Sequence, residues 1–278
     1  MRPAALLAVA VCALTWPRGA VAWNDVGYRI IVDKAVDALP KPIKEFYKGR
    51  KASLVEQAID PSRSERHLLF EADRLEPFPF LGLPEKREAA VARFGEEKVN
   101  EVGDLPWRVV DEYAKLVEAF RALDKDAIVD HSARLAVYVG ELHNPLNVSL
   151  HGDGDLYDQQ GLRERFNSRF LEVYGDKLKV SASTAIFLDR PSEYVFSIVR
   201  DSYVWADNLV LIDSLARVGV SSYDRFYYEG LLLRASGVAS ERLSRAAENA
   251  ASYWYTAWTA AGKPDLPKEV PVKSGEKF

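Results

Sequence analysis

The sequence predicts an all-α protein with one main domain. Two observations lead to this prediction. Apolar residues recur at three- and four-residue spacing through most of the 278-residue chain, as they do on the buried face of a helix. Alternating runs of the kind that form strands are few and short. The chain is also long enough to bury a substantial hydrophobic core without covalent cross-links.

The first 22 residues have the pattern of a secretory signal peptide. A short basic start at Arg2 precedes an apolar run over residues 4–14, and residues 20–22 read Ala-Val-Ala. This order of basic, apolar and small residues is typical of a cleaved export signal. The apolar run is shorter than the roughly 20 residues that a membrane-spanning helix needs. We therefore expect residues 1–22 to be removed and the protein to reach the periplasm or the medium.

The expected mature chain has a helical domain over residues 23–265 and a flexible tail over residues 266–278. The only cysteine, Cys12, falls within the predicted signal peptide, so the mature chain would form no disulfide. The formal net charge of the whole sequence is −4. A nucleic-acid-binding surface is usually basic, and no such face is evident. We also expect no integral membrane segment.

Each helix is predicted from its own apolar stripe and its flanking prolines. One stripe covers residues 30–39 and stops before Pro40, and another covers residues 107–123 after Pro106, a favoured position for proline at a helix start. Between them, residues 76–84 contain three prolines, which exclude a regular helix and indicate a packed loop.

Further helices follow in the second half of the chain. The predicted helical segments are residues 130–142, 162–174, 194–218, 223–236 and 240–261. Residues 149–161 contain three glycines and three aspartates. We interpret this stretch as a long loop, a common location for functional residues.

The chain holds four histidines, too few for a histidine-rich metal cluster. They are His67, His131, His143 and His151. His143 follows the helix over residues 130–142, where a capping or hydrogen-bonded core role is more common than metal binding. His131 is most simply a surface residue of that helix. After cleavage, Trp23 would present a free α-amine beside its own carbonyl oxygen, and these two atoms can chelate a cation.

Several segments together resemble one known superfamily. They are Trp23–Ile31, Arg66–His67, Leu135–Asn147, Gly161–Asn167 and the terminal stretch from Arg242 to Pro264. In this order and spacing the chain resembles the zinc-dependent phospholipase C and single-strand-specific nuclease superfamily. The resemblance implies a bundle of helices around a cleft with three zinc ions, which activate water for attack on a phosphodiester.

The resemblance also implies which residues would bind zinc, and most of those positions are substituted. The retained positions are Trp23, Asp60, His67 and Glu141. The substituted ligand positions hold Tyr28, Val137, Asn147, Arg163 and Asn167. Because a zinc ion needs about four donors, we do not expect the full three-zinc centre. The expected content is no metal or a single zinc ion.

Loss of metal would leave buried carboxylates without a cation, which is costly. We therefore expect Arg163 to form an ion pair with Glu141 or Asp60. On this interpretation the protein is non-catalytic, with a structural role or a binding role toward a phospholipid or another phosphodiester.

Two alternatives remain. In one, the protein is a metal-dependent phosphodiesterase with a reduced site at the four retained positions, where a metal-bound water is the nucleophile. In the other, His143 or His151 replaces a lost ligand. His143 lies two residues after Glu141 on a helix and points away from it, which makes the loop residue His151 the better candidate.

Overall fold

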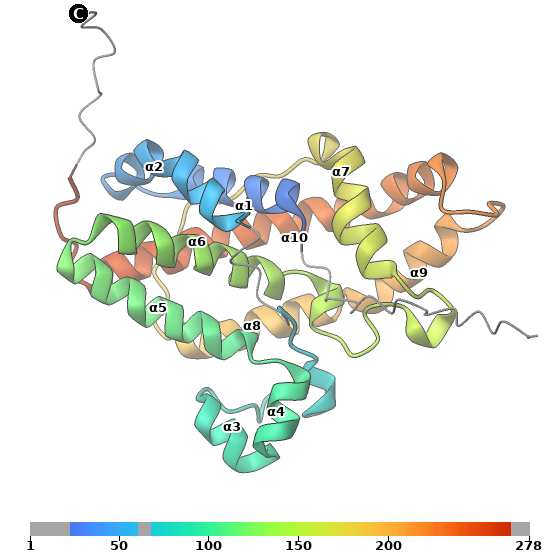
Figure 1. The fold of residues 1–278 in the computed structure, drawn as a ribbon, viewed down its shortest axis with the longest axis horizontal. Helices are drawn as coiled ribbons and strands as arrows, with labels where there is room; N and C mark the ends of the chain where they lie inside the picture. Colours follow the sequence, from blue (N-terminus) through green and yellow to red (C-terminus); the bar gives the residue numbers. More distant parts are fainter. Residues whose placement is uncertain (1–22, 61–67, 268–278) are drawn as a thin grey trace, which may run out of the picture.

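The structure is a computed structural model that describes residues 23–60 and 68–267. The described residues form helices, turns and loops and contain no strand, which confirms the all-α prediction (Figure 1). The predicted signal peptide, His67 and most of the predicted tail lie outside the described ranges. In the part of the chain that is described, no helix has the length and apolar character to cross a bilayer.

The helices follow one another closely along the chain. They are α1 (Asp25–Ala38), α2 (Ile43–Ala58), α3 (Arg87–Phe94), α4 (Glu96–Val102), α5 (Leu105–Ala122), α6 (Lys125–Leu142), a π-helix (Glu164–Phe170), α7 (Leu171–Tyr174), α8 (Pro191–Tyr203), α9 (Ala206–Ala216) and α10 (Arg225–Ala260). Short 3₁₀ turns lie at Ala72–Arg74, Pro145–Asn147, Asp155–Tyr157 and Gly175–Lys177.

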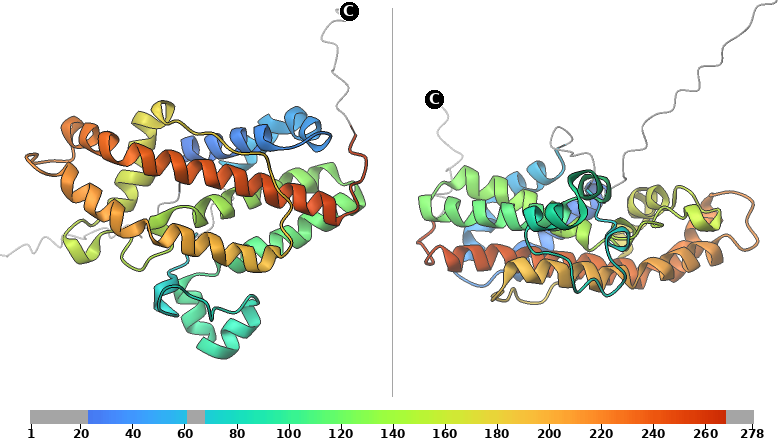
Figure 2. Two further views of the ribbon diagram at one scale, coloured as in Figure 1. Left: turned by 180° about the vertical axis from the view of Figure 1, so that it is seen from behind. Right: turned by 90° about the horizontal axis from the view of Figure 1, so that it is seen from below.

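The long helix α10 organises the bundle. It packs against α1, α5, α6 and α9, and α9 runs back beside its first half (Figure 2). Trp254 of α10 stacks on Tyr47 of α2 with 4.7 Å between ring centroids, and its indole Nε1 donates to the carbonyl of Ser132 in α6. Helices α3 and α4 pack on each other and project from the bundle below α8 in Figure 1.

The first predicted helices are confirmed, and their ends have clear physical causes. Asn24 caps α1, because its side-chain oxygen accepts from the Gly27 amide, a favoured role for asparagine. Helix α5 begins with Pro106 in its first turn. The proline-rich loop is also packed as expected, since the Phe80 ring is buried and lies against Tyr203.

Three predicted boundaries were wrong. Helix α6 begins five residues early, at Lys125, because Asp124 accepts from the amides of the first turn. The predicted break between residues 236 and 240 is absent, and α10 is one helix of 36 residues. Residues 194–218 instead divide into α8 and α9.

The division between α8 and α9 depends on a distant residue. Arg242 of α10 donates to the carbonyl of Asp201 at 3.2 Å and to Ser202 Oγ at 3.4 Å. The last carbonyls of a helix have no partner within it and need one from elsewhere. Arg242 supplies such a partner at the end of α8, an effect that apolar spacing along the sequence cannot reveal.

Candidate functional site

Glu141, at the end of α6, is the centre of the site. It is fully buried and accepts three hydrogen bonds from protein groups. Oε1 accepts from the backbone nitrogen of Trp23 at 2.9 Å and from the Tyr28 hydroxyl at 2.8 Å. Oε2 accepts from the Asn147 side-chain amide. The Glu141 carboxylate is therefore in contact with one other retained position, Trp23, and with two substituted positions, Tyr28 and Asn147.

Trp23 is held in place by its indole ring. The indole Nε1 donates to the Gly140 carbonyl at 2.9 Å, and the ring lies 5.8 Å from that of Phe166. A Cβ on Gly140 would stand 2.9 Å from Cδ1 of Ile31 in α1, so the glycine allows α1 and α6 to approach closely. This packing fixes the Trp23 nitrogen against Glu141.

Burial controls the protonation of this cluster. It raises the pKa of Glu141 to about 7, although the hydrogen bonds from Tyr28, Trp23 and Asn147 act in the opposite direction. Burial, followed by the nearby Glu141 carboxylate, raises the pKa of Tyr28 well above its usual value. The tyrosine therefore stays a neutral donor, and no cationic side chain contacts Glu141 among the described residues.

Two further positions that the resemblance marks as substituted, Asn167 and Val137, lie within or against the packed interior. Asn167 is buried in the π-helix, and its backbone carbonyl accepts from the Asn24 amide at 3.3 Å. Val137 lies one helical turn before Glu141 and packs against the hydrophobic core. Departures from regular α-helix such as this π-helix are frequent at functional sites. The π-helix contains the substituted position Asn167 and begins one residue after the substituted position Arg163.

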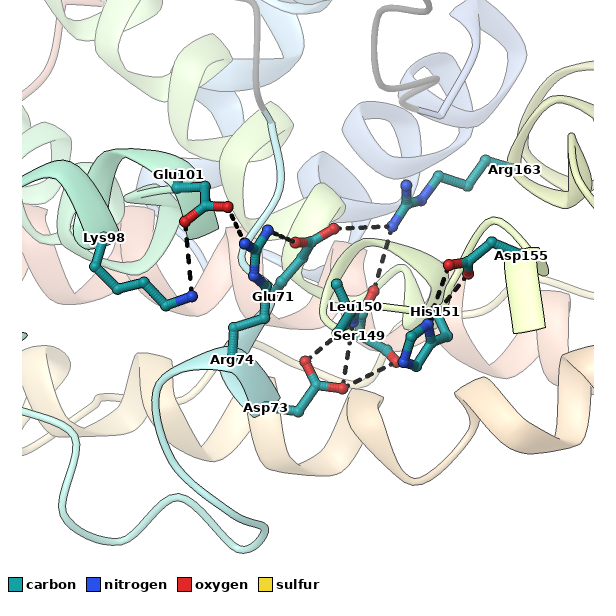
Figure 3. A network of polar contacts seen from close by, with 10 residues as sticks. All are labelled: Glu71, Asp73, Arg74, Lys98, Glu101, Ser149, Leu150, His151, Asp155 and Arg163. Carbon is teal, nitrogen blue, oxygen red and sulfur yellow. Dashed lines mark hydrogen bonds and ion pairs between the residues drawn. The ribbon is translucent and has the colours of Figure 1, made fainter.

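The predicted ion pair between Arg163 and Glu141 or Asp60 was wrong. Arg163 donates to the Leu146 carbonyl at 2.8 Å and to the Ser149 carbonyl at 3.2 Å, and it lies 3.7 Å from Glu71 Oε1 (Figure 3). The Arg163 guanidinium is therefore bound by two carbonyls of the loop after α6 and by the Glu71 carboxylate. Glu141 is satisfied instead by neutral donors. Burial lowers the pKa of Arg163.

Glu71 belongs to a wider polar network that holds two loops together. Arg74 pairs with Glu71 at 3.0 Å and also with Glu101. Asp73 accepts from the Leu150 amide at 3.0 Å, and the Ser149 hydroxyl donates to it at 3.3 Å (Figure 3). The Tyr203 hydroxyl also donates to Asp73 at 3.3 Å. The segment after the predicted ligand His67 is thus attached to the loop that follows α6.

The remaining histidines do not contact Glu141. His143 is buried, with its Nε2 2.9 Å from the Asn249 side-chain nitrogen, which confirms the predicted hydrogen-bonded core role. Burial lowers its pKa well below the usual value. His151 lies on the loop with Nδ1 3.2 Å from the Asp155 carboxylate. His131 is partly exposed, with 22% of its side chain accessible, and its Nδ1 lies 2.8 Å from Glu112 Oε2.

The described residues do not fit a zinc centre. Within residues 23–60 and 68–267, no group of three or more histidine, cysteine, aspartate or glutamate side chains could hold a metal ion. Asp60 follows α2 and is half-buried, whereas His67 lies outside the described residues. Around Glu141 the neighbours are hydrogen-bond donors, while zinc requires donor atoms with free electron pairs.

A second buried polar cluster gave no signal in the sequence. Asp213 of α9 accepts from Arg165 at 3.1 Å, from Gln159 at 2.6 Å and from the Tyr227 hydroxyl. Arg165 also lies over the Tyr223 ring, 4.0 Å from its centroid. These residues join the loop, the π-helix, α9 and α10. Their partners are far apart in the sequence, so no local motif identifies the cluster.

No protein-family profile matches this chain, and no curated protein matches it. The resemblance to the phospholipase C and nuclease superfamily thus stays a prediction from short sequence segments. Because one fold can carry many functions, the chemistry around Glu141 is the better guide to function.

Proposed function

We propose that this protein is an exported, non-catalytic relative of the zinc-dependent phospholipase C and nuclease superfamily, with a structural or ligand-binding role. The supporting observation is the environment of Glu141. Both carboxylate oxygens are occupied by protein donors, and the side chain is fully buried. A metal-activated water needs an accessible cation with an open coordination position, and this arrangement offers neither.

The proposal includes a replacement for the lost metal charge. The Trp23 nitrogen is a peptide amide in the full chain, 2.9 Å from Glu141. Cleavage after Ala22 would convert it into an α-amine, a group with a pKa of about 8 that is mostly protonated at neutral pH. A buried carboxylate is strongly stabilised by a hydrogen-bonded cation at this distance. The Trp23 ammonium group would thus form the ion pair with Glu141 that we predicted for Arg163.

The alternative is a phosphodiesterase with a reduced metal site at Trp23, Asp60, His67 and Glu141. One observation favours it. Asn147 Oδ1 is buried and has no hydrogen-bond partner within the described residues, and an unused buried acceptor is a suitable neighbour for a cation. The alternative requires the Trp23 amine to be unprotonated, because a protonated amine cannot bind a metal.

Elemental analysis distinguishes the two functions. The chain that begins at Trp23 is purified without chelator, and its zinc content is measured together with hydrolysis of bis(p-nitrophenyl) phosphate. We expect a zinc content far below one ion per chain and no turnover. One or more tightly bound ions, with turnover that chelator abolishes and Glu141→Gln removes, would contradict the non-catalytic function and support the alternative.

A further inference from the structure

A surface groove of about 610 Å³ lies between α5 and α6, which pack side by side (Figure 1). Two of the side chains that line it are held by one buried carboxylate. Glu112 of α5 is 6% exposed, and its Oε2 lies 2.8 Å from Nδ1 of His131 in α6. Its Oε1 accepts from Nζ of Lys115 at 2.7 Å. Glu112 therefore fixes the positions of both His131 and Lys115 in the groove.

The contact with Glu112 determines what His131 offers to a ligand. An ionised carboxylate only accepts hydrogen bonds, so the neutral imidazole ring donates to it from Nδ1. The second ring nitrogen, Nε2, is then an acceptor. The His131 side chain is partly exposed and lines the groove. Its Nε2 is therefore available to accept a hydrogen bond from a hydroxyl group of a molecule in the groove.

The other charged side chains of the groove also form pairs. Arg108 donates to Asp104 at 2.6 Å, and Arg134 donates to Asp130 at 3.2 Å. Asp111 adds a further carboxylate, which is exposed. A charged ligand would therefore meet a like charge beside nearly every opposite one, and such contacts are costly. A neutral ligand with many hydrogen-bond donors and acceptors avoids this repulsion and still uses both kinds of charged group.

A second hollow, of about 500 Å³, adjoins the groove and shares His131 and Lys115 with it. Four alanines of α5 and α6 line this hollow, namely Ala114, Ala119, Ala122 and Ala127. Its two carboxylates already have partners, since Glu118 pairs with Arg121 and Asp124 accepts from the amides of the first turn of α6. The hollow therefore provides an apolar wall beside the polar groove.

We propose that the groove and the adjoining hollow form a binding site for a neutral saccharide. Each sugar hydroxyl both donates and accepts hydrogen bonds, and hydrogen bonds to ionised groups are roughly twice as strong as those between neutral groups. Asp111, Arg108 and Arg134 therefore match the hydroxyls, while the alanine wall matches the apolar C–H face of a sugar ring. Small-molecule sites usually measure roughly 300 to 1,000 Å³, as these hollows do. The site is separate from Glu141, so it does not depend on whether that carboxylate binds a metal.

Titration with three sugars of similar size and different charge tests the class of ligand. The purified protein is titrated with methyl α-glucoside, which is neutral, with glucosamine, which is cationic, and with glucuronate, which is anionic. Nuclear magnetic resonance follows the binding. We expect saturable binding of methyl α-glucoside, and binding of each charged sugar weaker by at least about fivefold. No saturable binding of methyl α-glucoside, or tighter binding of either charged sugar, would overturn the proposal.

Substitutions of exposed aspartates locate the binding. Asp111→Ala removes a charged acceptor from the groove and should weaken binding of methyl α-glucoside by about tenfold. The matched control is Asp126→Ala, because Asp126 is an exposed residue of α6 that lines neither hollow. It should leave the binding unchanged. Equal affinity in the two variants would show that the sugar does not bind in this groove.

Glu112 should act on binding through His131. In Glu112→Gln, Lys115 can only donate, so it takes the amide oxygen and leaves the amide nitrogen to donate to Nδ1. Nε2 then carries the proton and is no longer an acceptor, and we expect binding of methyl α-glucoside about threefold weaker or more. The nitrogen chemical shifts of the imidazole ring report its tautomer, and circular dichroism checks the helical content. A proton on Nε2 in the natural protein, or undiminished binding in His131→Ala, would contradict this role.

Discussion

The backbone nitrogen of Trp23 lies 2.9 Å from Oε1 of Glu141, and both residues are buried. This contact joins the start of α1 to the end of α6. The nitrogen is an amide in the full chain, and the proposed cleavage after Ala22 would make it an amine, so the same geometry would hold either a neutral donor or a cation. Whether the peptide bond between Ala22 and Trp23 is intact would therefore determine the net charge of the buried cluster around Glu141.

The pH dependence of the free energy of unfolding should show whether the Ala22–Trp23 bond is intact. In a chain that retains Ala22, burial raises the pKa of Glu141 from about 4.5 to about 7. The folded state then binds a proton that the unfolded state has released, so stability is greatest below pH 4.5 and falls until about pH 7. The loss should be roughly 3 kcal/mol at most. Urea unfolding between pH 4.5 and 8 measures it.

Two matched chains complete this test. In the chain that begins at Trp23, the α-ammonium group favours the ionised carboxylate, so the fall in stability should be smaller. Glu141→Gln in the chain that retains Ala22 removes the titrating group while it preserves an acceptor, and should flatten the profile. If the slope persists in Glu141→Gln, another group causes it and the prediction is wrong.

Arg163 should be important for stability although it does not pair with Glu141. Arg163→Ala removes two hydrogen bonds to loop carbonyls and the pairing with Glu71. Because the carbonyls would lose a charged donor, we expect a loss of about 2 to 3 kcal/mol in the free energy of unfolding. The control, Arg169→Ala, removes an exposed pair with Glu172 and should cost less than about 1 kcal/mol. Equal losses would show that Arg163 has no special anchoring role.

The buried cluster around Asp213 gives a second stability prediction. Asp213→Asn leaves Arg165 without its carboxylate partner in the protein interior. Removal of one member of a buried ion pair typically costs about 3 to 5 kcal/mol. The control is Asp207→Asn. Asp207 lies on the exposed side of the same helix, so this substitution should change the free energy of unfolding by less than about 0.5 kcal/mol. Thermal unfolding followed by circular dichroism compares the two, and similar midpoints would exclude a structural role for the cluster.

The sequence predicted helices whose ends depend on nearby residues. It did not predict helix ends and contacts that depend on residues distant in the chain. The stripe before Pro40 and the start at Pro106 correspond to α1 and α5. The end of α8 was missed because its carbonyl partner is Arg242, 41 residues away. At the site, the resemblance singled out Glu141 and Trp23 among several positions, and the fold brings these two into contact. The partner of Arg163 was not predicted, because Glu71 reaches it only through the fold.

Gly152 should be required for the loop that Arg163 anchors. A Cβ at Gly152 would stand 2.0 Å from the Leu146 carbonyl oxygen, and that oxygen also accepts from Arg163. Gly152→Ala must therefore displace the loop, and we expect a loss of about 1 to 3 kcal/mol. Hydrogen exchange of the Leu150 amide, which donates to Asp73, should become faster in this variant because that bond closes the same loop.

The matched control is Gly237→Ala. Gly237 lies within α10, and a Cβ there would meet nothing within 4 Å. Alanine favours the helix over glycine by about 0.8 to 1 kcal/mol, so this variant should be more stable than the natural chain and should leave exchange at Leu150 unchanged. A Gly152→Ala variant as stable as Gly237→Ala would show that the loop adapts freely, and would contradict the anchoring of the loop by Arg163 and Asp73.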